Sequence, residues 1–276
     1  MKVALLQLTS SDDPAANLPA TLDLVAEAAG RGADLIATPE VTNCVSSDRA
    51  HQMSVLRREA EDETLAALRA AARDHACHIL IGSLALRTDD PDGRFANRSF
   101  LIGPDGAIMA RYDKIHMFDV DVSEAETYRE SAGYRPGTRA TLAETPWGKI
   151  GLTVCYDIRF PTLHRRLAQA GADILTIPAA FSPVTGAAHW APLLRARAIE
   201  TGCFVLAPAQ TGTHDVRAGR PRRTHGHSIV VAPWGDVLLD AGTAPGCHVI
   251  EIDPGQVAEA RRRVPSLTAD RPWDGP

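Results

Sequence analysis

The sequence contains no long hydrophobic run and no block of charge of one sign. No segment approaches the roughly 20 apolar residues that a membrane-spanning helix requires. The 34 acidic and 29 basic side chains give a formal net charge of −5, and the densest basic stretch is the four residues 220–223. We therefore expect no membrane span, and the charge balance argues against a nucleic-acid or anionic-lipid partner.

The chain also lacks paired cysteines and residue clusters with metal-binding spacing. Its five cysteines, at positions 44, 77, 155, 203 and 247, form no C-x-x-C pair. This odd number argues against a disulfide scaffold or a zinc ribbon and favours a reduced, cytoplasmic location. The first six residues have neither the apolar core nor the cleavage site of a signal peptide. The groups 75–78 and 225–227 contain His and Cys, but consecutive strand residues point to opposite faces, so we expect no metal. No glycine-rich phosphate loop occurs, and we expect no other cofactor.

What the 276 residues do contain is an alternation of short apolar runs and longer amphipathic segments, which is typical of α/β proteins. The first run, residues 2–8, predicts a buried strand. A helix should follow, because Leu18, Leu22 and Val25 share one helical face. Proline is accepted in the first helical turn, so we place the start of this helix near Asn17 to Pro19.

The second half of the chain repeats the plan of the first half. Four segments match in the same order: 149–152 with 2–5, 171–178 with 32–39, 203–209 with 78–84, and the turn 233–235 with the turn 104–106. Matching order predicts two copies of one α/β unit. Two such units bury most area when their sheets pack together, which predicts a four-layer αββα sandwich with an internal pseudo-two-fold repeat.

No low-complexity linker separates the halves, and residues 133–147 between them contain ordinary loop residues. We therefore expect a single domain over residues 1–276. Its related halves span about 1–145 and 146–265, and a C-terminal tail covers 266–276.

Three polar residues directly follow predicted strands, where α/β sheets place their ligand sites. Glu40 follows the strand 34–38, Lys114 follows the strand 107–111, and Cys155 ends the strand 149–154. A thiol at such a turn is expected to be partly exposed and close to free backbone N–H groups, which can stabilise a thiolate or a nearby oxyanion. Taken singly, the pattern favours a solvated loop carboxylate for Glu40 and a surface residue for Lys114. The other four cysteines are interpreted as bystanders.

These segments together resemble the nitrilase superfamily of carbon–nitrogen hydrolases. Thr38-Pro39-Glu40 resembles its glutamate motif, residues 113–119 its lysine motif, and residues 151–161 its cysteine motif. Residues 188–201, 209–214 and 226–235 are similar to the Nit branch, and within it to the deaminated glutathione amidases.

The resemblance implies an αββα sandwich with a Glu–Lys–Cys triad. Cys155 would be the nucleophile, Glu40 the general base, and Lys114 an oxyanion ligand together with the backbone N–H of Tyr156. Glu130, in the segment resembling the second-glutamate motif of the family, would orient Lys114.

The resemblance also implies a small-molecule amide substrate. Phe181, His189 and Arg159 are the candidate substrate-binding residues, although Arg159 could instead face solvent. Deaminated glutathione is the first expected substrate, and an ω-amidase acting on 2-oxoglutaramate or another small carboxylate-bearing amide is the alternative. A catalytically silent binding or regulatory module is the non-enzyme alternative. The family also implies a homodimer or a larger homo-oligomer.

Overall fold

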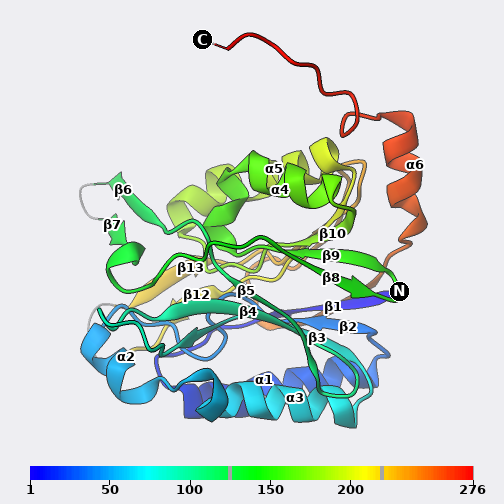
Figure 1. Cartoon of the computed structure of the whole chain (residues 1–276). Coiled ribbons are helices and arrows are strands. Elements are labelled where there is room, and N and C mark those ends of the chain that lie inside the picture. The colour runs from blue at the N-terminus through cyan, green and yellow to red at the C-terminus, as the bar shows by residue number, and fades with distance from the viewer. Residues whose placement is uncertain (124–125, 218–220, 276) are drawn as a thin grey trace.

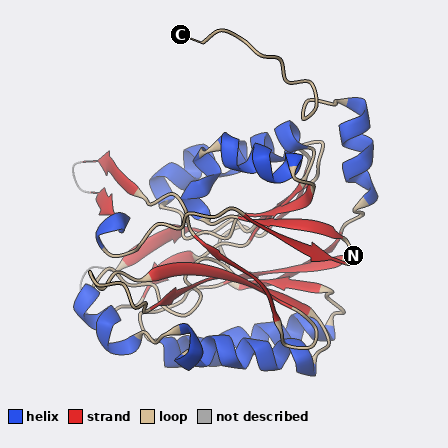
Figure 2. Cartoon of the chain, viewed as in Figure 1, coloured by secondary structure: helices blue, strands red, loops and turns tan. Residues whose placement is uncertain are grey.

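Two six-stranded β-sheets stack face to face, and helices cover the outer side of each sheet (Figures 1 and 2). The computed structural model describes residues 1–123, 126–217 and 221–275. The first sheet has the order β16 (Gly246–Glu251), β1 (Lys2–Gln7), β2 (Leu35–Ala37), β3 (His78–Leu86), β4 (Ala96–Ile102) and β5 (Ile108–Asp113). The second sheet has the order β15 (Val237–Asp240), β14 (Ile229–Val231), β11 (Phe204–Ala207), β10 (Ala172–Thr176), β9 (Gly148–Leu152) and β8 (Thr141–Thr145).

Helices form the two outer layers, which confirms the predicted αββα sandwich. Below the first sheet in Figure 1 lie α1 (Pro14–Gly30) and α3 (Glu63–Asp74), and above the second lie α4 (Pro161–Gln169) and α5 (Pro183–Thr201). The remaining elements are α2 (Arg49–Val55), α6 (Gly255–Arg263), the 3₁₀ turns η1 (Glu59–Glu61), η2 (Glu130–Ala132) and η3 (Cys155–Arg159), and the hairpins β6–β7 (Asp119–Ser123, Glu126–Arg129) and β12–β13 (Thr211–His214, Arg222–His225). Within the described ranges, no helix is long and apolar enough to cross a membrane.

Successive side chains along each strand point to opposite faces of the sheet, and both faces are buried. On β1, Val3 and Leu5 belong to the hydrophobic cluster that fills the space between the sheets. Their neighbours Ala4 and Leu6 belong instead to the cluster under α1 and α3. Because successive strand residues point to opposite faces, a continuous apolar run satisfies both layers at once.

Strand order confirms the internal repeat. The series β1-β2-β3-β4-β5 in the first sheet corresponds, strand by strand, to β9-β10-β11-β14-β15 in the second. The sixth strand of each sheet comes from the other half of the chain: β16 pairs antiparallel with β1, and β8 pairs antiparallel with β9. The two halves therefore exchange their last strands.

The first helix begins earlier than the sequence predicts. Helix α1 starts at Pro14, and the Asp13 side chain caps it by accepting a hydrogen bond from the Ala15 N–H. The sequence predicts that Pro19 lies in the first turn of the helix. Pro14 is in that turn instead, and Pro19 lies inside the helix. The expected start near Asn17 to Pro19 was wrong because an acceptable cap and a first-turn proline were both available upstream.

The topology brings the three predicted site residues to one edge of the sandwich. Strands β1, β2 and β3 are parallel, and β5 runs in the same direction because two antiparallel pairings separate it from β3. Glu40 and Lys114 therefore follow carboxyl ends at the same edge of the first sheet. Cys155 follows β9, at the carboxyl edge of the parallel strands β9, β10 and β11.

Gly82 of β3 keeps the two sheets close at this edge. A Cβ atom at this position would lie 2.1 Å from the Thr38 carbonyl oxygen and 2.5 Å from Pro178 Cβ. Both contacts are shorter than real Cβ atoms show. The loop that carries Glu40 and the end of β10 can approach each other only because no side chain stands between them.

We expect Gly82→Ala to reduce the free energy of unfolding by about 3 kcal/mol, because overpacking forces backbone shifts on both sheets. Urea denaturation measures the change. Gly30→Ala is the matched control: nothing lies within 4 Å of a Cβ at Gly30, at the end of α1, and its effect should stay within about 1 kcal/mol. Equal stability of the two variants would contradict the close approach at Gly82.

Candidate active site

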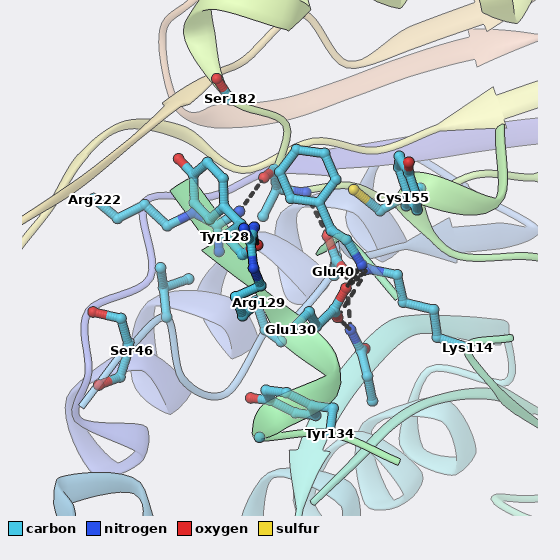
Figure 3. A pocket seen from close by; sticks show the side chains of 18 of the residues that line it. Glu40, Ser46, Lys114, Tyr128, Arg129, Glu130, Tyr134, Cys155, Ser182 and Arg222 are labelled. Atoms are coloured by element: carbon cyan, nitrogen blue, oxygen red, sulfur yellow. Dashed lines mark hydrogen bonds and ion pairs between the residues drawn. The ribbon is translucent and has the colours of Figure 1, made fainter. Parts of the chain in front are cut away.

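One cavity of about 350 Å³ brings the predicted triad together (Figure 3). Glu40, Lys114 and Cys155 all line it, as do Glu130 and Phe181. The three triad side chains are almost fully buried, with exposed fractions of 4% for Glu40, 2% for Lys114 and 7% for Cys155. Tyr156, the supporting residue after the thiol, also lines the cavity.

The Lys114 ammonium lies between two carboxylates. Its Nζ is 2.9 Å from Glu40 Oε1 and 2.8 Å from Glu130 Oε2. The backbone N–H of Phe118 donates to Glu130 Oε2 at 2.7 Å and fixes that carboxylate in turn. Burial alone would lower the pKa of Lys114, but the charges of Glu130 and Glu40 outweigh it and raise this pKa well above its usual value. The lysine is therefore a permanent cation.

The Glu40 carboxylate is held at both oxygens. Besides Lys114, Oε1 accepts a hydrogen bond from Asn97 Nδ2 at 2.9 Å, and Oε2 accepts one from the Ala180 N–H at 2.8 Å. Burial favours the neutral acid, but the ion pair and hydrogen bond with Lys114, with a further hydrogen bond from Cys155, lower the pKa of Glu40 below its usual value. The group is an ionised base placed against the thiol.

Cys155 occupies a strained turn that presents its thiol to Glu40. The residue has φ = 49°, in the left-handed region that non-glycine residues seldom adopt, and its N–H donates to the Pro178 carbonyl oxygen at 2.9 Å. It opens the 3₁₀ turn η3 directly after the second sheet's β9. Tyr156 is in the first turn of η3, where backbone N–H groups have no acceptor within the helix.

Burial and the Glu40 carboxylate raise the pKa of the Cys155 thiol well above its usual value, and Lys114 only partly opposes them. The sequence predicts a partly exposed thiol close to N–H groups that can stabilise a thiolate or an oxyanion. The structure instead buries the thiol beside Glu40, where the neutral form is favoured. The resting site therefore consists of a thiol, a carboxylate and an ammonium. A proton can pass from sulfur to Glu40 within one hydrogen bond.

Asp157 ties the cysteine turn to the segment that carries Lys114. Its Oδ2 accepts hydrogen bonds from the Tyr112 hydroxyl at 2.7 Å and from the Val154 N–H at 2.8 Å. His116 Nδ1 lies 2.7 Å from Asp157 Oδ1. His116 is thus occupied by Asp157, and the thiol has Glu40 rather than a histidine as its proton acceptor.

Of the three predicted substrate-binding residues, only Phe181 is in the cavity wall. The exposed His189 contacts Arg159 instead: His189 Nδ1 is 3.3 Å and 3.2 Å from the two terminal guanidinium nitrogens. The Arg159 guanidinium lies 5.5 Å from the Phe181 ring centroid and 5.9 Å from that of Tyr156. Arg159 and His189 therefore lie beside the aromatic residues of the wall and are not lining residues themselves.

Sequence reasoning missed several polar residues of the cavity, among them Asn97 and Arg222. Asn97 Nδ2 bridges the carboxylates of Glu40 and Glu130, at 2.9 Å and 3.2 Å. Asn97 is followed by Arg98 and Ser99 in β4, so its neighbours in the sequence did not mark it as a buried amide. Arg222 also lines the cavity, although the basic stretch around it is too short to suggest a site.

The two sheets stack face to face, and a thiol, a carboxylate and an ammonium group are buried together at the edge where the strands end. This fold and site define a nitrilase-type hydrolase. The family described as Carbon-nitrogen hydrolase matches residues 2–262, and the chain belongs to this family. Membership confirms the resemblance predicted from the motifs and makes the protein an enzyme that cleaves carbon–nitrogen bonds.

Individual relatives extend over almost the whole chain. A deaminated glutathione amidase from Synechocystis is 39% identical over 268 residues, covering 96% of each chain. The ω-amidase Nit2 of mouse is 35% identical, covering 98% of this chain and 95% of its own. The crystal structure of Nit3 from Saccharomyces cerevisiae, a member of branch 10 of the nitrilase superfamily, is 30% identical with a TM-score of 0.83, covering 99% of this chain and 97% of that one.

We expect Glu40→Gln to lower the pKa of the Cys155 thiol, because the substitution removes the negative charge that raises it and leaves Lys114 in place. Thiolate absorbance near 240 nm, followed against pH, measures this pKa. Cys155→Ala provides the baseline, since the other four thiols absorb in the same region. An unchanged or higher thiol pKa in Glu40→Gln would refute the electrostatic coupling of the pair.

Proposed function

We propose that the protein is an amidase that hydrolyses the 2-oxoglutaryl amide of deaminated glutathione to 2-oxoglutarate and cysteinylglycine. The observation that carries the amidase assignment is the Cys155 thiol, hydrogen-bonded to the buried Glu40 carboxylate beside Lys114. The similarity to the Synechocystis amidase supports the substrate. The second candidate is an ω-amidase acting on 2-oxoglutaramate, which the similarity to mouse Nit2 favours. A silent binding module would have no need to keep three ionisable groups buried together.

Acylation begins when Cys155 attacks the amide carbonyl carbon and Glu40 accepts the thiol proton. The new C–S bond places a negative charge on the former carbonyl oxygen. We propose that Lys114 and the backbone N–H of Tyr156 receive this oxyanion, and one such donor is worth about 3 kcal/mol of transition-state stabilisation. Glu130 keeps the ammonium in position through its two contacts with Nζ.

Collapse of the tetrahedral intermediate breaks the C–N bond. Glu40 gives its proton to the departing amine, and the acyl group stays on Cys155 as a thioester. In the second half of the reaction, Glu40 takes a proton from water as that water attacks the thioester. The C–S bond then breaks, the proton returns to sulfur, and the acid leaves.

We also propose a substrate contact, a domain organisation, a location and an assembly state. Phe181 would contact the substrate from the cavity wall, whereas binding roles for Arg159 and His189 stay predictions. We infer a single domain built from the halves 1–145 and 146–265 with the tail 266–276, a cytoplasmic location, and assembly into a homodimer or a larger homo-oligomer.

We expect Cys155→Ala to reduce amide hydrolysis by about 10⁴-fold or more, because removal of a nucleophile eliminates the covalent route. Release of cysteinylglycine from deaminated glutathione measures the activity, and circular dichroism verifies the fold. Cys247→Ala, a half-buried cysteine of β16, is the matched control and should retain wild-type turnover. Substantial hydrolysis by Cys155→Ala would reject the proposed mechanism.

The two candidate substrates differ only in the leaving group, so kinetics can separate them. We expect kcat/KM for deaminated glutathione to exceed that for 2-oxoglutaramate, since the chain is 39% identical to a deaminated glutathione amidase and 35% identical to an ω-amidase. Side-by-side measurement on one enzyme preparation decides the order. Equal values, or a preference for 2-oxoglutaramate, would favour the ω-amidase assignment instead.

A further inference from the structure

One buried amide in the cavity wall contacts both of the carboxylates that hold Lys114. Asn97 of β4 is only 2% exposed, and its Nδ2 donates to Glu40 Oε1 at 2.9 Å and to Glu130 Oε1 at 3.2 Å. The two protons of one NH₂ group thus serve two different carboxylates. An amide oxygen turned toward these anions would be repelled, so their charges fix the orientation of the Asn97 side chain.

The backbone fixes the position of Asn97 beside Lys114. Strands β4 and β5 are antiparallel, and the Lys114 N–H donates to the Asn97 carbonyl oxygen at 3.0 Å. The next residue, Arg98, forms a two-pronged ion pair with Asp113 of β5, at 2.6 Å and 2.8 Å. Because successive strand residues point to opposite faces, this ion pair secures the register that turns Asn97 into the cavity wall.

This arrangement leaves one buried acceptor without a partner. Asn97 Oδ1 has no hydrogen-bond donor among the described residues. A buried polar atom without a partner destabilises a fold, and such atoms are few in native proteins. A leucine of similar size would avoid this cost. The presence of an amide at this position is therefore explained by what its Nδ2 does at the two carboxylates.

The hydrogen bonds to Glu40 are divided unequally between its oxygens. Oε1 accepts from Lys114 Nζ at 2.9 Å and from Asn97 Nδ2, so both of its lone pairs are used. Oε2 accepts from the Ala180 N–H at 2.8 Å, which leaves it one lone pair. The Cys155 thiol is hydrogen-bonded to the same carboxylate. By elimination, Oε2 is the oxygen that receives it.

We propose that Asn97 is a positioning residue that reserves Oε2 of Glu40 for every proton transfer of the reaction. In acylation the S–H bond of Cys155 breaks, an O–H bond forms at Oε2, and the electron pair left on sulfur forms the C–S bond. The same proton then moves from Oε2 to the departing nitrogen. Without the Asn97 amide, Oε1 would have a free lone pair, and the proton could settle on the side of the carboxylate that faces Lys114. The inference rests on the proposed amidase function.

The variant Asn97→Ala tests this role through the pH profile. It removes a hydrogen bond that favours the ionised carboxylate, so the pKa of Glu40 should rise. Acylation needs the ionised form, and the acid limb of kcat/KM should therefore move to higher pH by about one unit. The profile is measured from initial rates after dilution from a neutral stock, on whichever candidate amide wild type hydrolyses faster.

The same variant should separate kcat from KM. We expect kcat to fall by about 10-fold or more, because the base is no longer held in one position for its proton transfers. KM should change by less than about threefold, since the proposed role involves Glu40 and not the substrate. A loss of packing alone would not move the acid limb.

The chain offers a matched control in a second buried asparagine. Asn43 is 1% exposed, and its side chain exchanges hydrogen bonds of 2.9 Å with the backbone of Ala85, the residue opposite Asn97 on β3. Its third side-chain partner is Asp62, which is not a lining residue of the cavity. Asn43→Ala should lose stability in urea denaturation, while its acid limb should stay at the wild-type pH.

A conservative variant provides partial rescue. Asn97→Ser keeps one hydroxyl donor, which can serve one carboxylate but not two. Its kcat and its acid limb should fall between those of wild type and Asn97→Ala. Asn97→Ser is also the test variant if Asn97→Ala does not fold.

The outcomes are distinct. A lower kcat with an unmoved acid limb, a rise in KM that accounts for the whole loss, or wild-type kinetics in Asn97→Ala would overturn the role of Asn97. An equal shift of the limb in Asn43→Ala would also overturn it, because loosened packing would then be the cause. Failure of wild type to hydrolyse either amide, or full activity in Cys155→Ala, would instead count against the proposed function.

Discussion

The buried ammonium of Lys114 is the interaction on which the rest of the site depends. Removing a charge from water is costly, and it is tolerated here because Glu40 and Glu130 both contact Nζ. The same cation keeps Glu40 ionised despite its burial, and the ionised Glu40 keeps the thiol of Cys155 protonated. One charged centre thus keeps Glu40 ionised and, through Glu40, keeps Cys155 protonated.

Most of the fold was predictable from the periodicity of the apolar residues and from the order of the repeated segments. Alternation of apolar runs gave the α/β class, and four segments repeated in order gave two sheets packed together. The start of α1 was missed because Pro14 and Pro19 both satisfy the local rule, and only the cap at Asp13 decides between them. Exchange of the strands β8 and β16 was not visible either, since an edge strand has the same sequence pattern whichever sheet it joins.

The candidate site was predictable where residues follow strands and less so elsewhere. Glu40, Lys114 and Cys155 meet because topology alone brings strand ends to one edge. Asn97 lies within a strand, and Arg222 lies in a hairpin that the sequence reading did not include, so neither has a position that marks it. Phe181 is in the wall as expected, whereas Arg159 contacts His189 outside it. Side-chain direction and pairing decide these cases, and both depend on the completed packing.

Strand exchange also has a consequence for biosynthesis. Lys2 of β1 pairs with Glu251 of β16, so the first sheet lacks its sixth strand until a segment far along the sequence has been synthesised. Until then β1 has an unpaired edge, which is a template for association with other nascent chains. We expect the early chain to rely on chaperones for this reason. Pairing with β16 removes this free edge and connects the N-terminal strand to the second half of the sequence.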